Sequence, residues 1–185
     1  MKIQHEVDAI DINCGCPQGI ARRGKYGAFL LEEPDQLVKC VTALVKNVGV
    51  PVCVKVRILP TGLEDSLVLY RRLVHEAGAS MLTIHGRNRH QKGHNTGKAD
   101  WDAIRRVVDE LGHFVPILAN GGISNMDDVR ECLRVTEADG VMSSEGILEY
   151  PALFSESGTA SVGHKRTGPG RLELARQYME FVHQH

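Results

Sequence analysis

The chain has 185 residues, with 22 lysines and arginines against 23 aspartates and glutamates, and a formal net charge of −1. Hydrophobic residues make up 42% of the chain and charged residues 24%, which is typical of a globular domain and excludes disorder and collagen-like or low-complexity structure. The charge balance also excludes a protein that holds nucleic acid by bulk positive charge, although local basic patches stay open.

Apolar runs in the sequence are short. No uncharged run approaches the roughly 18 residues that span a bilayer, and residues 1–10 contain acids where a signal peptide has its apolar segment. The five cysteines lie mostly inside apolar runs, which argues against a disulfide framework. We therefore expect a reduced protein with no membrane partner, located in the cytoplasm with the nucleus as a second compartment.

Short β-branched runs alternate with helical stretches along the chain. The runs predict strands at residues 7–12, 52–56, 81–84, 115–119 and 140–142, and their nearly continuous apolar character is typical of parallel strands. Helical periodicity follows Pro34, Asp65 and Asp100, and Ser124 is predicted to be the N-cap of a fourth helix. The alternation predicts an α/β parallel sheet with right-handed crossovers.

This alternation ends near residue 154. Residues 155–170 are rich in glycine and serine and predict a linker, and residues 171–185 have helical spacing. We therefore divide the chain into an α/β unit at residues 1–154, a linker at 155–170 and the start of a helical domain at 171–185.

Each predicted strand ends in polar or glycine-rich residues. Ligands bind at the carboxyl ends of the strands in parallel α/β proteins, so these clusters should converge on one site. They are the segments 11–17 (DINCGCP), 54–57 (VKVR), 83–87 (TIHGR), 118–124 (LANGGIS) and 140–146 (GVMSSEG).

Two residues in these clusters carry the strongest chemical signal. Cys16 lies in a tight turn between Gly15 and Pro17, where its side chain faces the mouth of the sheet, whereas Cys14 is expected to be a buried filler. Lys55 interrupts an apolar run. Burying an unpaired ammonium is costly, so Lys55 needs an anionic or polar ligand unless its strand is an edge strand that faces water.

The segment 85–98 contains four lysines or arginines and no acid. A metal ion would be repelled there despite the histidines, so we expect no metal site. Phosphate groups suit the same segment, with a solvated basic loop as the alternative. His85, which precedes Gly86 and Arg87, is interpreted as facing a ligand, with a satisfied core histidine as the alternative.

Glycine- or serine-rich turns at residues 120–124 and 143–146 precede helical stretches. Backbone N–H groups in such turns can bind an anion. Two of them after the last two strands are typical of the phosphate site of α/β barrels. A pair of glycines that only makes a turn is the alternative.

In chain order, these motifs resemble those of the tRNA-dihydrouridine synthases, the Dus family. The ending SSEG followed by PALF is similar to the eukaryotic branch, which acts on the first uridines of the D-loop. The matching segments are 11–18 (DINCGCPQ), 22–30 (RRGKYGAFL), 54–57 (VKVR), 83–93 (TIHGRNRHQKG), 97–101 (GKADW), 120–123 (NGGI) and 139–146 (DGVMSSEG).

The resemblance implies an FMN-binding TIM barrel followed by a helical domain that binds tRNA. It implies that NADPH reduces FMN, that the flavin delivers hydride to C6 of a flipped-out uridine, and that Cys16 protonates C5. By motif, Asn13 and Arg57 face the uracil, and Lys55 and His85 face the flavin ring. The flavin phosphate is assigned to Asn120, Gly121, Gly122, Ser144, Glu145 and Gly146, and tRNA backbone contacts are assigned to Arg22, Arg23, Lys25, Arg87, Arg89 and Lys92.

A complete TIM barrel takes about 250 residues and eight strands, whereas five strands are predicted here. The resemblance implies that the first three strands are missing and that the chain ends within the helical domain. We therefore expect a partial TIM (β/α)8 barrel, an incomplete form that is inactive and binds FMN weakly, with no protein partner. The alternatives are another FMN barrel oxidoreductase of the dihydroorotate dehydrogenase type, and a non-catalytic tRNA-binding remnant.

Overall fold

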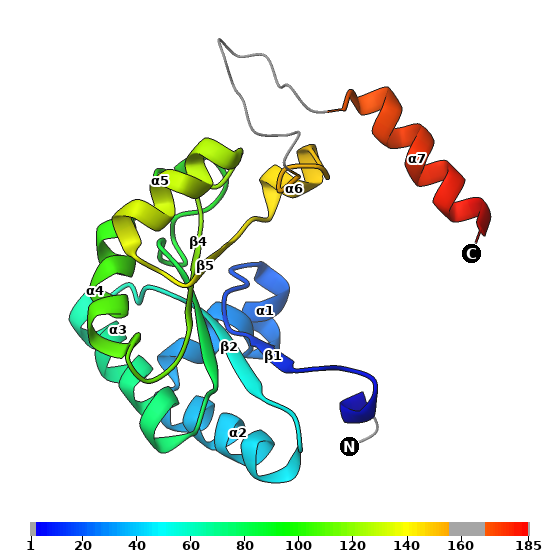
Figure 1. Ribbon diagram of the computed structural model, residues 1–185. Helices are drawn as coiled ribbons and strands as arrows, with labels where there is room; N and C mark the ends of the chain where they lie inside the picture. Colours follow the sequence, from blue (N-terminus) through cyan, green and yellow to red (C-terminus); the bar gives the residue numbers. More distant parts are fainter. Residues whose placement is uncertain (1–2, 156–168, 185) are drawn as a thin grey trace.

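One parallel sheet forms the centre of the protein. The computed structural model describes residues 3–155 and 169–184, in which five strands are hydrogen-bonded side by side in sequence order (Figure 1). The strands are Ile10–Asn13 (β1), Val52–Arg57 (β2), Met81–His85 (β3), Ile117–Asn120 (β4) and Gly140–Met142 (β5). The predicted parallel α/β class is confirmed, and the sheet is consistent with part of a TIM barrel.

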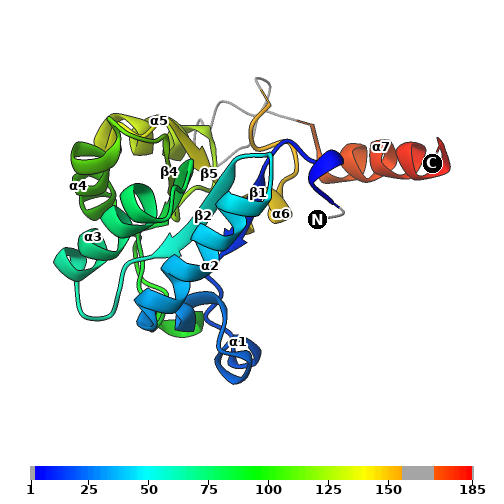
Figure 2. The same ribbon diagram turned by 90° about the horizontal axis from the view of Figure 1, so that it is seen from below.

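Helices α2 to α5 cover one face of this sheet and leave the other face open (Figures 1 and 2). The α-helices are Gly19–Gly24 (α1), Pro34–Asn47 (α2), Leu63–Arg71 (α3), Trp101–Leu111 (α4), Met126–Thr136 (α5), Glu145–Glu149 (α6) and Arg171–Gln184 (α7). Short 3₁₀ segments lie at Ile3–His5 (η1), Gly27–Glu32 (η2) and Gly93–Asn95 (η4), and a π-helical turn, Arg72–Glu76 (η3), continues α3.

The hydrophobic core lies between the sheet and the covering helices. Val54, Leu82 and Ile117, from three neighbouring strands, are fully buried there. Leu37 of α2 and Ile104 of α4 close the same core from the helix side. Burial of this apolar surface is what fixes the strands against the helices.

Side chains alternate along a strand, so the strand residues next to those of the core point to the open face. The strand register places them in two rows across the sheet. One row is Asn13, Lys55, Thr83 and Leu118, and the next row toward the carboxyl ends is Arg57, His85, Asn120 and Met142. The strand register thus places the polar residues of these two rows side by side on the open face.

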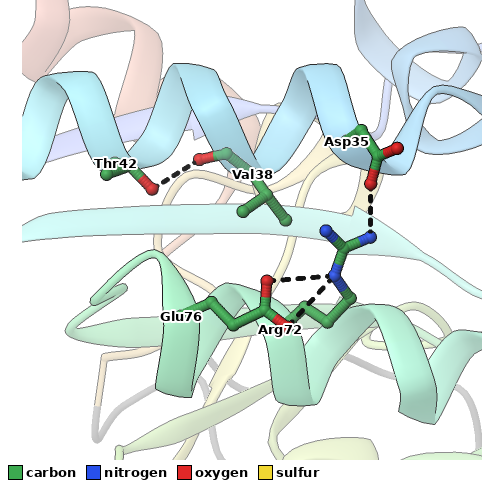
Figure 3. Close-up of polar contacts among 5 residues, drawn as sticks. All are labelled: Asp35, Val38, Thr42, Arg72 and Glu76. Atoms are coloured by element: carbon green, nitrogen blue, oxygen red, sulfur yellow. Dashed lines mark hydrogen bonds and ion pairs between the residues drawn. The ribbon is translucent and has the colours of Figure 1, made fainter.

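Polar contacts join the outer helices to each other. Arg72, at the start of η3, pairs with Asp35 of α2 at 2.8 Å and with Glu76 of its own turn at 3.2 Å (Figure 3). Within α2, the hydroxyl of Thr42 donates to the carbonyl of Val38 at 2.8 Å. Solvent-exposed ion pairs contribute little stability each. We therefore attribute the positions of these helices mainly to the apolar core beneath them.

Element boundaries differ from the sequence predictions by one to three residues: four strands end one residue later than predicted, and β4 begins at Ile117 rather than at residue 115. β1 begins at Ile10 rather than at residue 7, because its ladder with β2 starts there and Val7 is exposed. Asn125, not Ser124, is the N-cap of α5, and its side-chain oxygen accepts hydrogen bonds from two first-turn amides at 2.8 and 2.9 Å. Both residue types are good caps, so the sequence alone places this helix start only to within one residue.

The C-terminal part of the chain is described in part. The predicted linker falls largely on residues 156–168, which lie outside the described residues. A helix is present where helical spacing predicts one, as α7, and its apolar side chains Leu172, Tyr178 and Phe181 are exposed. The division of the chain into domains stays a prediction.

Candidate functional site

A cavity opens at the carboxyl ends of the strands, on the open face of the sheet. It measures about 600 Å³, which is within the range of small-molecule and cofactor sites. All five strands contribute to it, through residues at their carboxyl ends or in the segments that follow them. The candidate residues from the sequence that line it are Asn13, Cys16, Lys55, Arg57, His85, Arg87, Lys92, Asn120, Gly121, Gly122, Ser144, Glu145 and Gly146.

The turn that carries Cys16 is held by its own backbone and by Asn13. The side-chain oxygen of Asn13 accepts hydrogen bonds from the amides of Gly15 at 3.0 Å and Cys16 at 3.2 Å. The carbonyl of Cys16 accepts from the amide of Ala28 at 3.0 Å. A local turn of this kind is what an asparagine side chain favours. Cys16 is therefore presented to the cavity from a turn whose amides are already satisfied.

Two cationic side chains bind the carbonyls of the same turn. Arg57 donates from Nε to the carbonyl of Gly15 at 2.7 Å and from Nη1 to the carbonyl of Asn88 at 3.0 Å. Lys92 donates from Nζ to the carbonyl of Pro17 at 2.8 Å. The cysteine turn and the basic loop after β3 are thus joined directly by Lys92 and through Arg57 of β2, which donates to both. The acceptors are backbone carbonyls, so residue types carry no signal for these contacts.

Cys14 and Cys16 lie in different environments, although only one residue separates them. Cys14 is fully buried, and burial raises the pKa of its thiol to about 12, with smaller contributions from Asp11 and Cys40. Cys16 is partly exposed and lines the cavity. Only the second thiol can meet a ligand there.

Lys55 has no hydrogen-bond or ion-pair partner within residues 3–155 and 169–184. Burial lowers the pKa of its ammonium, the positive charge of Arg57 lowers it further, and Asp11 opposes both effects. Beside it in register lies Thr83, which is 1% exposed and whose hydroxyl has no partner among the described residues. Thr83 is not among the residues that line the cavity.

His85 contacts Arg87 and Gly121. Its Nε2 lies 3.2 Å from Nη1 of Arg87, whose Nε and Nη2 donate to the carbonyl of Gly97 at 3.2 and 2.9 Å. A β-carbon on Gly121 would stand 2.8 Å from Cδ2 of His85. Gly121 also has a φ of +106°. Only glycine fits at this position, for reasons of both space and backbone conformation.

The two candidate phosphate turns pack against each other. The hydroxyl of Ser143 donates to the carbonyl of Ile123 at 2.8 Å, and a β-carbon on Gly146 would lie 2.5 Å from the same carbonyl oxygen. Trp101 donates from its indole N–H to the carbonyl of Gly121 at 3.0 Å. These contacts hold the backbone of both turns at one end of the cavity.

Asn120 and Glu145 interact with protein groups in this region. The side-chain amide of Asn120 donates to the carbonyl of Met142 at 2.8 Å and thereby ties β4 to β5. The carboxylate of Glu145 lies close enough to Arg87 to oppose the lowering of its pKa by burial. Both residues also line the cavity.

The other candidate tRNA contacts lie outside the cavity. Arg22, Arg23 and Lys25 are exposed on α1 and at its end, and form no ion pair with any described residue. Arg89 is largely buried in an ion pair with Glu32. The structure therefore places these cations in at least two groups, of which α1 carries the more accessible one.

Residues 3–155 and 169–184 contain no cluster of three histidine, cysteine, aspartate or glutamate side chains placed to hold a metal ion. Among the helices in these ranges, none combines the length and apolar character needed to cross a membrane.

The parallel sheet and the polar cavity at its carboxyl ends define a ligand-binding protein of the α/β barrel class. The family model described as dihydrouridine synthase (Dus) matches residues 1–185, and the chain belongs to this family.

Three relatives place it further. The chain is 42% identical over 182 residues to a tRNA-dihydrouridine(16/17) synthase NAD(P)(+)-like protein of Rattus norvegicus. The aligned region covers 98% of this chain and 38% of that relative. It is 41% identical over 180 residues to the tRNA-dihydrouridine(16/17) synthase of Saccharomyces cerevisiae, and the aligned region covers 97% of this chain and 42% of that relative. A tRNA-dihydrouridine(20a/20b) synthase of Schizosaccharomyces pombe is 35% identical over 149 residues, which are 80% of this chain and 44% of that relative. The chain thus spans about two fifths of the length of these relatives. The family and eukaryotic branch inferred from the motifs are confirmed.

Proposed function

We propose that this chain carries the catalytic centre of an FMN-dependent tRNA-dihydrouridine synthase that uses NADPH and acts on the first uridines of the D-loop. The overall change adds a hydride and a proton across the C5–C6 double bond of a uridine. The observation that carries the proposal is the position of Cys16, on a hydrogen-bonded turn at the cavity that also contains the ammonium of Lys55, which has no partner among the described residues.

The residues of the cavity fit FMN. The ammonium of Lys55 lines the cavity and has no protein partner among the described residues, so it is free to pair with a polar or anionic group of a ligand. At the other end, the backbone of Gly121, Gly122, Ser144, Glu145 and Gly146, beside Asn120, would hold the phosphate. When bound, FMN supplies the hydride that reduces C6. Lys55 would stabilise negative charge on the flavin ring, and His85 would contact the same ring.

The chain's own acid is Cys16. Cysteine thiols carry a proton at neutral pH and can donate it to carbon in the transition state. Arg57 and Lys92 donate hydrogen bonds to carbonyls of the turn, and the side-chain oxygen of Asn13 accepts from its amides, so the turn that carries the thiol is held in place. Preorganisation of this kind lowers the entropic part of the barrier.

Asn13 and Arg57 are proposed to face the uracil. Each has donors left over: Nδ2 of Asn13 and Nη2 of Arg57 bond to no group within the described ranges. Amide and guanidinium donors suit the two carbonyls of a uracil ring. A uridine reaches such a cavity only after it leaves the base stack.

The tRNA backbone is proposed to contact Arg22, Arg23, Lys25, Arg87, Arg89 and Lys92, and the protein would meet tRNA in the cytoplasm and the nucleus. Neutralising Arg22 and Arg23 together is expected to weaken tRNA binding and to flatten its dependence on log salt by up to about two units, one for each lost phosphate contact. The Arg89→Gln single variant should change the slope less, because its guanidinium is paired with Glu32. Filter binding over a salt series measures both. Equal slopes for the Arg22/Arg23 variant and the wild type would contradict the assignment of α1.

The function itself is tested with a chimera, in which residues 1–185 replace the matching segment of the Saccharomyces cerevisiae relative. The chimera is expressed in yeast that lacks this relative, and dihydrouridine at positions 16 and 17 is measured in purified tRNA by mass spectrometry. Restoration of dihydrouridine is expected. A folded, flavin-loaded chimera that oxidises NADPH without forming dihydrouridine would contradict the proposal.

A further inference from the structure

We propose that Arg87 is a positioning residue that keeps His85 in the Nδ1–H tautomer, so that the imidazole offers a hydrogen-bond donor at Nδ1. The proposal deepens the proposed function and rests on it in one respect: the donor would serve a flavin in the cavity. It concerns a residue that the motifs assign to tRNA and whose guanidinium lies against the histidine.

The contact itself determines the direction of the hydrogen bond. A guanidinium has only donors, so Nε2 of His85 must accept the bond from Nη1 of Arg87. A histidine nitrogen accepts only when it carries no proton. A neutral imidazole that accepts at Nε2 must therefore carry its proton on Nδ1.

The charges around His85 keep the ring neutral. Burial, together with the smaller effects of the positive charges of Arg57, Lys55 and Arg87, lowers its pKa to about 3. Two carboxylates act on these cations, Glu145 on Arg87 and Asp11 on Lys55. Because three cations surround the imidazole, the ring stays neutral. It can then offer a ligand a hydrogen bond, while Lys55 offers a positive charge.

The surroundings of both side chains fix this arrangement. Arg87 cannot turn away freely, because its Nε and Nη2 hold the carbonyl of Gly97. The Cδ2–Nε2 edge of His85 packs on Gly121, where a β-carbon would come within 2.8 and 3.0 Å of these two atoms. Nδ1 is the ring nitrogen that has no partner within residues 3–155 and 169–184. An isolated neutral histidine in water favours the opposite tautomer, so the protein must impose this one.

Long-range ¹H–¹⁵N correlation spectra of the chain, labelled with ¹⁵N-histidine at pH 7, test the proposal. The His85 signals are assigned by their loss in His85→Gln. In the wild type, Nε2 is expected to resonate as the unprotonated nitrogen. In Arg87→Met, the ratio of the Nδ1–H to the Nε2–H form should fall by about tenfold or more, the equilibrium effect of losing a hydrogen bond to a charged group. Arg87→Lys retains a donor and should restore the wild-type pattern.

His75, whose ring packs edge-on against Phe114 at 4.7 Å, is the internal control and should not change. A wild-type His85 that is protonated at Nε2 would overturn the proposal, even if Arg87→Met failed to fold. An unchanged tautomer in a folded Arg87→Met variant would also overturn it. The spectra need neither FMN nor tRNA, so they stand apart from the chimera experiment, and either result can fail without the other.

Discussion

Replacement of Cys16 by alanine is expected to abolish dihydrouridine formation in the chimera and to leave flavin reduction by NADPH intact. Cys16 lines the cavity, whereas the neighbouring Cys14 is fully buried, with its thiol pKa raised to about 12. General acid catalysis by a positioned side chain contributes about 10²- to 10⁴-fold. Turnover should therefore fall at least about 100-fold. Stopped-flow flavin reduction and single-turnover dihydrouridine assays measure the two half-reactions separately.

Cys14→Ala is the matched control for this substitution. It removes the same thiol from the same segment, but from the core, where the expected cost is about 1 kcal/mol of stability and no loss of turnover. Equal loss of dihydrouridine in both variants would show that the segment is merely sensitive to substitution. Full activity of Cys16→Ala would show that Cys16 is not the general acid.

The fold could be read from the sequence because its signals are local. Five β-branched runs alternate with amphipathic stretches, and this alternation is typical of parallel strands connected by helices. The start of β1 was placed too early because residues 7–9 continue the pattern of the strand, while the ladder with β2 begins only at Ile10. The cap of α5 was misplaced from Asn125 to Ser124 because both side chains can cap a helix.

The site was predictable in part. Cys16, Lys55 and His85 stand out because polar side chains interrupt or end apolar runs, and the structure places all three around one cavity. The hydrogen bonds of Arg57 and Lys92 could not be foreseen, because their acceptors are backbone carbonyls of a distant turn. Such partners depend on tertiary distances and leave no mark in residue types.

Replacement of Lys55 by methionine is expected to separate stability from ligand binding. The ammonium is buried beside Arg57 without a protein partner among the described residues, so its removal should leave the free energy of unfolding unchanged or raise it by about 1–2 kcal/mol. FMN affinity of the chimera should fall about 10- to 100-fold, since a hydrogen bond to a charged group is worth about 1.5–3 kcal/mol. Urea unfolding of the chain and flavin fluorescence titration of the chimera measure the two effects.

The pH dependence of stability gives this prediction a second, independent readout. Burial lowers the pKa of Lys55 in the folded chain, so between that lowered value and the ordinary value near 10.4 the unfolded chain binds more protons. Wild-type stability should therefore rise with pH across this window, and Lys55→Met should lack that rise. The exposed Lys39 provides the control, since Lys39→Met should keep both the rise and the FMN affinity. If Lys55→Met destabilises the chain and binds FMN as the wild type does, Lys55 is a structural residue whose partner is the protein, and the cavity lacks the cation that a flavin ring would require.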